Sequence, residues 1–99
     1  MKPHILVVDD EAPIRELLGT YFQSRGYQVS STSTAADAVR KAAETSLNLV
    51  LLDLVLPDAD GLEVLGDLRK AHPNLPVIIM TGMGSDEALL KEANITGTL

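Results

Sequence analysis

Residues 48–61 read NLVLLDLVLPDADG, and this stretch decides the fold class of the chain. The four apolar residues 49–52 run without a break up to Asp53, which is typical of a strand buried on both faces of a parallel sheet. Residues 57–61 are rich in turn-forming types, and leucines then recur at helical spacing until Pro73. The stretch therefore predicts a buried strand, a loop and a helix.

The rest of the chain repeats this alternation of short apolar runs and helical periods. Strands that alternate with helices form a parallel sheet covered by helices on both faces. The order βαβαβαβα therefore predicts one α/β domain with a doubly wound parallel sheet. The expected strands are 5–8, 27–31, 48–54 and 77–80, and the expected helices run from Pro13 towards Gly26, from a cap at Thr34 to Glu44, from Leu62 to before Pro73, and from Ser85 to about Asn94.

Two packing details follow from the same patterns. The strand at 27–31 is more polar than the others, so we expect it towards an edge of the sheet. The first helix carries an apolar stripe that we expect to face the sheet. The stripe consists of Ile14, Leu17, Leu18, Tyr21 and Phe22.

Composition excludes several classes of protein. The chain has 99 residues, a net charge of −6 and 3% aromatic residues, so it offers no basic stripe or stacking surface for nucleic acid. It has no cysteine, which excludes disulfides and thiolate metal sites. The N-terminal sequence MKPHILVVDD reads neither as a signal peptide nor as a membrane span. We therefore expect a cytoplasmic protein that contacts neither nucleic acid nor membrane directly.

Polar residues follow the expected strands at the point where each strand ends. Asp9 and Asp10 follow the first strand, Asp53 ends the third, and Thr81 follows the fourth. Ligands of parallel α/β sheets bind at the carboxyl ends of the strands. If the first and third strands are neighbours, the three carboxylates converge there. Either Asp9 or Asp10 could instead cap the helix that follows.

Converging carboxylates need a compensating charge, which a hard divalent cation supplies. We infer a Mg²⁺ site with Asp10 and Asp53 as direct ligands, the backbone carbonyl of Val55 as a third candidate ligand, and Asp9 acting through water. A carboxylate beside Mg²⁺ can attack a phosphoryl group and form an acyl phosphate. Asp53 is the expected nucleophile, and Thr81 offers a hydroxyl to the transferred group.

Three motifs together resemble the response regulator receiver domain: VVDDE at 7–11, LLDLVLPDADGLEVL at 51–65 and VIIMTG at 77–82. The similarity covers essentially the whole chain, 1–99, and implies a flavodoxin-like, CheY-like fold. Position by position, Asp53 matches the phosphorylation site, Asp9 and Asp10 match the acidic pair that binds Mg²⁺, and Thr81 matches the switch hydroxyl. Pro57 and Gly61 match the loop that shapes the site.

The resemblance also implies a function in two-component signal transduction. A sensor histidine kinase or phosphotransfer protein would supply the phosphoryl group from phosphohistidine. The receiver would catalyse its own phosphorylation and dephosphorylation without being a conventional turnover enzyme. The form of the loop after Asp53 resembles that of regulators with transcriptional output domains.

The end of the chain departs from the family pattern. Receivers continue into a fifth strand and fifth helix, and the strand carries a lysine and an aromatic residue of the switch. Lys91 falls on the expected fourth helix and does not match that lysine, so the final β-α unit is missing. A shortened chain, a naturally short protein and a sheet completed by a partner chain are the explanations left open. We expect self-association through the sheet edge and an impaired phospho-switch.

Two other functions compete with this interpretation. A Mg²⁺-dependent phosphatase would need a second acid two residues after the nucleophile, where this chain has Val55. A degenerate receiver could act as an interaction or dimerisation module without phosphorylation; the intact acids argue against it and the missing fifth strand argues for it. A dinucleotide-binding fold is disfavoured because no glycine-rich turn follows the first strand.

The remaining charged and ring-bearing side chains are expected to have structural roles. We expect Asp58, Asp60 and Glu63 to be solvated acids of the loop and helix start. His4 and His72 are isolated in the sequence, so we expect surface or strand-start positions for them and no metal or acid–base role.

Overall fold

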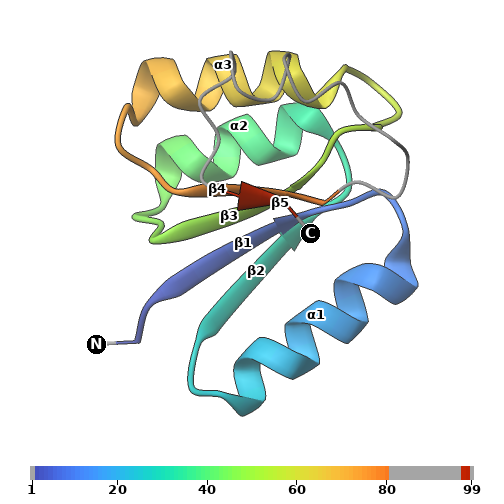
Figure 1. The fold of residues 1–99 in the computed structure, drawn as a ribbon, viewed down its shortest axis with the longest axis vertical. Helices are drawn as coiled ribbons and strands as arrows, with labels where there is room; N and C mark the ends of the chain where they lie inside the picture. The colour runs from blue at the N-terminus through green and yellow to red at the C-terminus, as the bar shows by residue number, and fades with distance from the viewer. Residues whose placement is uncertain (1, 81–96, 99) are drawn as a thin grey trace.

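The computed structural model describes residues 2–80 and 97–98, which form a parallel sheet between two layers of helices (Figure 1). Within the described residues the sheet has five strands in the order β2-β1-β3-β4-β5, and every neighbouring pair is parallel. The strands are β1 (His4–Val8), β2 (Gln28–Thr32), β3 (Leu49–Asp53), β4 (Val77–Met80) and β5 (Gly97–Thr98), and the helices are α1 (Ala12–Ser24), α2 (Ala35–Glu44) and α3 (Gly61–Ala71).

This arrangement confirms the α/β class and the parallel sheet predicted from the sequence. The more polar strand β2 lies at one edge of the sheet, as expected, and β1 and β3 are neighbours. The helix expected from Ser85 lies outside the described residues. The expectation of a chain without a fifth strand is refined, because Gly97–Thr98 pair with Ile78–Ile79 of β4 as a short fifth strand. Self-association through this edge stays a prediction.

Local signals in the sequence set the helix ends. Pro13 lies in the first turn of α1, where a missing N–H costs little. Gly26 follows the end of α1 with φ 91°, a left-handed conformation that glycine adopts without strain. Thr34 caps α2, because its hydroxyl oxygen accepts a hydrogen bond from the Asp37 N–H at 3.2 Å. These three observations confirm the predicted boundaries.

The sheet face under α2 and α3 holds most of the core. Its buried cluster contains fourteen of the described residues. Leu6, Val8 and Leu52 from the strands are fully buried there, and Val64, Leu65 and Leu68 of α3 are at most 2% exposed. Burial of this kind is the main favourable contribution to folding. The ends of β1 and β3 are therefore held by well-packed side chains.

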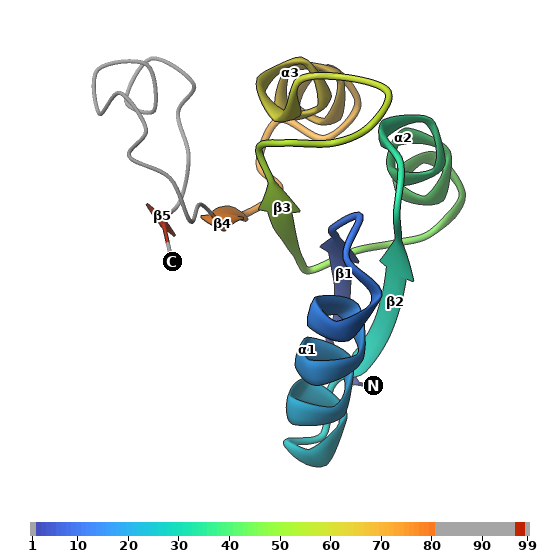
Figure 2. The ribbon, with the colours of Figure 1, turned by 90° about the vertical axis from the view of Figure 1, so that its right-hand side faces the viewer.

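The opposite sheet face is covered by α1, which packs on β1 and β2 (Figure 2). The expectation that the apolar stripe of α1 faces the sheet is confirmed for Leu18 and Phe22 and wrong for Leu17. Leu18 and Phe22 pack against Ile5, Val7 and Leu51, as a spacing of four places them on one face. The other pair, Leu17 and Tyr21, is 65% and 48% exposed. The stripe is broader than the surface that two strands offer.

No described helix combines the length and the apolar character needed to cross a membrane.

Candidate functional site

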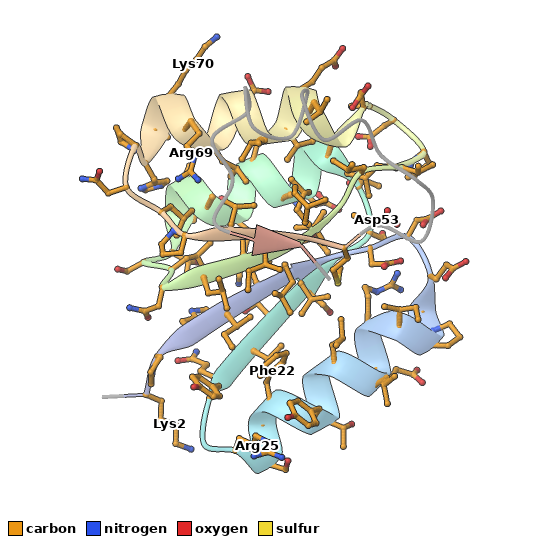
Figure 3. All side chains as sticks on the ribbon, in the orientation of Figure 1. Lys2, Phe22, Arg25, Asp53, Arg69 and Lys70 are labelled. Atoms are coloured by element: carbon orange, nitrogen blue, oxygen red, sulfur yellow. The ribbon has the colours of Figure 1, made fainter. Side chains whose placement is uncertain are left out.

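The neighbouring strands β1 and β3 bring three carboxylates together at the edge of the sheet where the carboxyl ends of the strands lie. Val8 of β1 is aligned with Leu52 of β3, so the residues that follow them, Asp9 and Asp53, lie at the same edge. Side-chain oxygens of Asp9, Asp10 and Asp53 all lie within 4.8 Å of one another. Figure 3 shows Asp53 at this edge, where the strands end. The predicted convergence of the three acids is confirmed.

Asp9 is held in place by several hydrogen bonds. It is 5% exposed, and its N–H donates to the Thr32 carbonyl at 3.1 Å. Its Oδ1 accepts from the Glu11 N–H at 2.8 Å, and its carbonyl accepts from the Arg15 guanidinium at 2.8 Å. Glu11 is the N-cap residue of α1 and makes no side-chain capping bond. The described contacts therefore favour a role at the sheet edge over helix capping for Asp9.

The surroundings of Asp53 disfavour ionisation of its carboxyl group. Burial raises the pKa of Asp53, and the negative charges of Asp9 and Asp10 raise it further. The Val55 N–H opposes this effect by donating to Asp53 Oδ1 at 3.0 Å. A raised pKa among like charges is the condition that a bound cation relieves.

The loop after Asp53 returns closely onto the strand end. The Gly61 N–H donates to the Leu54 carbonyl at 2.8 Å, and Val55 and Asp60 form an isolated antiparallel bridge. A Cβ at Gly61 would lie 2.5 Å from Leu54 Cα and 2.7 Å from the Asp53 carbonyl oxygen. Only glycine fits this approach, which gives the predicted role of Gly61 a physical reason.

Asp58 is exposed, as expected for a solvated loop acid, but it also makes contacts that the sequence did not predict. Its carboxylate accepts hydrogen bonds from the N–H groups of Ala35 at 2.7 Å and Ala36 at 3.1 Å, at the start of α2. These bonds hold the pKa of Asp58 below its ordinary value. This contact could not be predicted from the sequence because the partners lie 23 and 22 residues away, with no local signal to link them.

The other loop and helix-start acids follow the prediction more closely. Glu63 is exposed in the first turn of α3. Asp60 is the N-cap residue of α3, and its side chain accepts from the Leu62 N–H at 2.8 Å. An acid at this position satisfies a free N–H and interacts favourably with the helix dipole.

The two histidines lie away from the acids. His4 begins β1, as expected, but it is 6% exposed instead of lying on the surface. Its Nε2 lies 2.7 Å from Ser30 Oγ, and burial followed by the charge of Lys41 lowers the pKa of His4. His72 ends α3, and its Nε2 lies 2.9 Å from the Ala42 carbonyl oxygen. Both contacts are structural.

Of the two remaining predicted site residues, only Val55 lies within the described residues. Thr81 lies outside the described residues, so its role as a switch hydroxyl stays a prediction. Val55 is 69% exposed, and its N–H is bonded to Asp53. This bond places the Val55 backbone beside the acids, while metal ligation by its carbonyl stays a prediction.

The donor set fits a hard divalent cation. Asp9, Asp10 and Asp53 offer only carboxylate oxygens, the ligand type that Mg²⁺ prefers, and Asp10 is exposed, so solvent can reach the group. Three closely spaced acids without a described counter-charge between them gain from such an ion.

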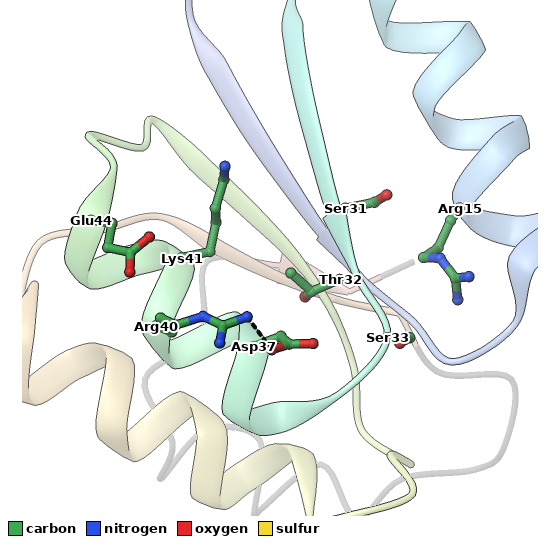
Figure 4. Close-up of a pocket in the computed structure, with 8 residues that line it drawn as sticks. All are labelled: Arg15, Ser31, Thr32, Ser33, Asp37, Arg40, Lys41 and Glu44. Carbon is green, nitrogen blue, oxygen red and sulfur yellow. Dashed lines mark hydrogen bonds and ion pairs between the residues drawn. The ribbon is translucent and has the colours of Figure 1, made fainter.

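A separate polar groove of about 530 Å³ lies along the free edge of β2, between α1 and α2 (Figure 4). Arg15, Thr32 and Lys41 are among its lining residues. Arg40 and Asp37 form an exposed ion pair there. The groove contains none of the three site acids, so we do not assign the phosphoryl chemistry to it.

Comparison with known protein families identifies the chain. Residues 5–98, nearly the whole sequence, match the response regulator receiver domain. The transcriptional regulatory protein ResD of Bacillus subtilis is 39% identical over 82 residues, which are 83% of this chain and 34% of that protein. The transcriptional regulatory protein GlrR of Escherichia coli is 35% identical over 83% of this chain and 18% of that protein. The chain thus spans about a third or less of these regulators.

Solved structures agree with this match. A CheY-like receiver domain protein from Methanospirillum hungatei superimposes with a TM-score of 0.94 at 30% identity, covering 100% of this chain and 81% of that one. The response regulator TrrA of Thermotoga maritima, solved in complex with Mg²⁺-BeF, gives a TM-score of 0.90 at 34% identity, covering 100% of this chain and 85% of that one. With its sheet order and its acidic cluster, the chain belongs to the family of response regulator receiver domains.

Proposed function

We propose that Asp53 accepts a phosphoryl group from the phosphohistidine of a sensor histidine kinase or phosphotransfer protein, in a reaction that requires Mg²⁺. Receiver domains typically work with histidine kinases, and the family match supports such a partner. The observation that carries the proposal is the cluster of Asp9, Asp10 and Asp53, whose oxygens lie within 4.8 Å of one another. TrrA was solved in complex with Mg²⁺-BeF, which supports metal binding by this chain.

Each site residue has its own role in the proposed reaction. In the proposed reaction a carboxylate oxygen of Asp53 forms a bond to phosphorus, the bond between phosphorus and the histidine nitrogen breaks, and that nitrogen keeps the electron pair and takes a proton from solvent. The Val55 N–H orients Asp53 by its bond to Oδ1. Asp10 and Asp53 would hold Mg²⁺, with Asp9 acting through water and the Val55 carbonyl as a further ligand.

The metal would neutralise charge on the transferred oxygens when bound. Asp53 must be ionised to attack, and its raised pKa makes ionisation harder without a cation nearby. We therefore expect phosphorylation to depend on Mg²⁺ most strongly in the acid range. Thr81 would contact the phosphoryl group afterwards and begin the switch in conformation.

The output of the protein is a further part of the proposal. ResD and GlrR are transcriptional regulators, and each contains a large additional length of chain that this sequence does not cover. We propose that this receiver likewise controls a transcriptional output, from the cytoplasm. The phospho-switch is the feature that distinguishes this function from that of a pure interaction module.

Incubation with a small-molecule phosphodonor and Mg²⁺, followed by intact mass measurement, tests the proposal. We expect one phosphoryl adduct in the wild type, none in Asp53→Asn, and an unchanged adduct in Asp67→Asn, which removes an exposed acid of α3. Absence of an adduct in a wild-type protein that binds Mg²⁺ would contradict the proposal and favour an interaction module.

A further inference from the structure

The N-terminus of α2 is held by a residue from a distant loop. Its first three backbone N–H groups belong to Ala35, Ala36 and Asp37, and none has a partner within the helix. The Thr34 hydroxyl takes the N–H of Asp37, whereas the carboxylate of Asp58 takes the other two, one oxygen for each. Asp58 thus supplies two of the three capping bonds from outside the helix.

The loop that carries Asp58 is the loop that reaches the site. Val55, three residues earlier, donates its N–H to Asp53 Oδ1, and Leu54 is bonded to Gly61 at the other end of the loop. These contacts fix the inner side of residues 54–60 against β3. Asp58 fixes the outer side, because it joins the exposed part of the loop to α2.

We propose that Asp58 is a positioning residue for the phosphorylation site. By clamping the loop to α2, it keeps the Val55 backbone against Asp53 and so prepares the site for Mg²⁺. This inference rests on the proposed function of Asp53. Residues that do not bind a metal themselves but orient its ligands commonly influence the affinity of the site for the metal.

A simpler account is that Asp58 only stabilises α2. The chain offers a matched control for that account, because Thr34→Ala removes a cap from the same helix end and leaves the Asp58 carboxylate in place. A second control concerns charge. Asp58→Ala and Asp58→Asn lose the same negative charge, but asparagine keeps an oxygen that can accept from the α2 N–H groups.

The experiment measures Mg²⁺ affinity by calorimetry and the amide NMR signal of Val55 in the wild type and the three variants, with melting temperatures alongside. We expect Asp58→Ala to weaken Mg²⁺ binding about tenfold, the lower end of such effects, and to shift the Val55 amide signal. Asp58→Asn should lose clearly less affinity. Thr34→Ala should lower the melting temperature while its affinity for Mg²⁺ and its Val55 signal stay as in the wild type.

Each other result has a defined meaning. Wild-type affinity and an unshifted Val55 signal in Asp58→Ala would overturn the inference while leaving the function of Asp53 intact. Equal losses in Asp58→Ala and Asp58→Asn would assign the effect to charge, and an equal loss in Thr34→Ala would assign it to helix stability; both would overturn the inference. A wild-type protein that binds no Mg²⁺ would instead refute the proposed function, and the inference with it.

Discussion

The two faces of the sheet differ sharply in how they are packed. The face under α2 and α3 buries fourteen of the described residues in one cluster, whereas the face under α1 buries three. On the α1 side, Leu17 and Tyr21 remain largely exposed. The described residues therefore bury most of their core on one face of the sheet.

This difference shows which packing holds the site residues in position. Asp9 and Asp53 adjoin Val8 and Leu52, two fully buried residues of the well-packed cluster. The loop after Asp53 leads into α3, and Asp58 of this loop accepts a hydrogen bond from α2. The loop therefore lies on the well-packed side of the sheet. We conclude that the larger cluster anchors the strand ends and the loop that carry the site, and the following changes test that conclusion.

The largest difference should come from truncating a buried leucine of α3 and an exposed leucine of α1. Leu65→Ala removes a side chain that is 2% exposed in the larger cluster, so it should lower the free energy of unfolding by about 2–5 kcal/mol. Leu17→Ala removes a side chain that is 65% exposed and should cost about 0.5 kcal/mol or less. Urea denaturation of both variants measures the difference. Equal costs would contradict the difference in burial between the two leucines.

The close approach at Gly61 gives the next effect. In Gly61→Ala the new Cβ would meet the backbone of Leu54 and Asp53. We therefore expect the free energy of unfolding to fall by about 2–4 kcal/mol and Mg²⁺ binding to weaken. Gly66→Ala is the matched control, because a Cβ at this exposed position of α3 meets nothing within 4 Å. Gly66→Ala should raise the free energy of unfolding by about 0.5–1 kcal/mol. A harmless Gly61→Ala would contradict the described loop geometry.

Removal of the charge at Asp53 should have a smaller effect on the free energy of unfolding, and it should raise that free energy. Since folding raises the pKa of Asp53 above its ordinary value of 3.8, the stability of the metal-free wild type falls as pH rises through the range between the unfolded and folded pKa values. Asp53→Asn escapes this loss. At neutral pH it should be more stable by about 1 kcal/mol or less, because the carboxylate is partly solvated.

The comparison is made by thermal denaturation without metal at several pH values. The advantage of Asp53→Asn should be smallest below pH 3.8 and reach a plateau above the folded pKa of Asp53. Added Mg²⁺ should stabilise the wild type and reverse the order. An Asp53→Asn variant that is less stable than the metal-free wild type at neutral pH would show that the three acids do not repel one another.

Much of the fold and the acidic cluster could be predicted from the sequence. The apolar run before Asp53 and the caps at Thr34 and Gly26 are local signals, and local signals set elements and their ends. The meeting of Asp9 with Asp53 needed one further rule, that parallel strands end at the same edge.

The missed features are long-range. The bonds of Asp58 to the start of α2 depend on how a loop folds back, and the sequence around Asp58 is the same whether or not it does. The exposure of Leu17 and Tyr21 depends on how much sheet surface α1 covers, which hydrophobic spacing alone does not determine. Both features need the positions of neighbouring elements.

Locating the phosphoryl group within the chain tests the central claim most directly. Borohydride reduction of the phosphorylated protein converts an aspartyl phosphate to homoserine, and peptide sequencing by mass spectrometry then identifies the modified residue. The account predicts homoserine at position 53, formed only when Mg²⁺ is present. Modification at Asp10 or Asp58 with position 53 unchanged, or equal modification without Mg²⁺, would contradict it.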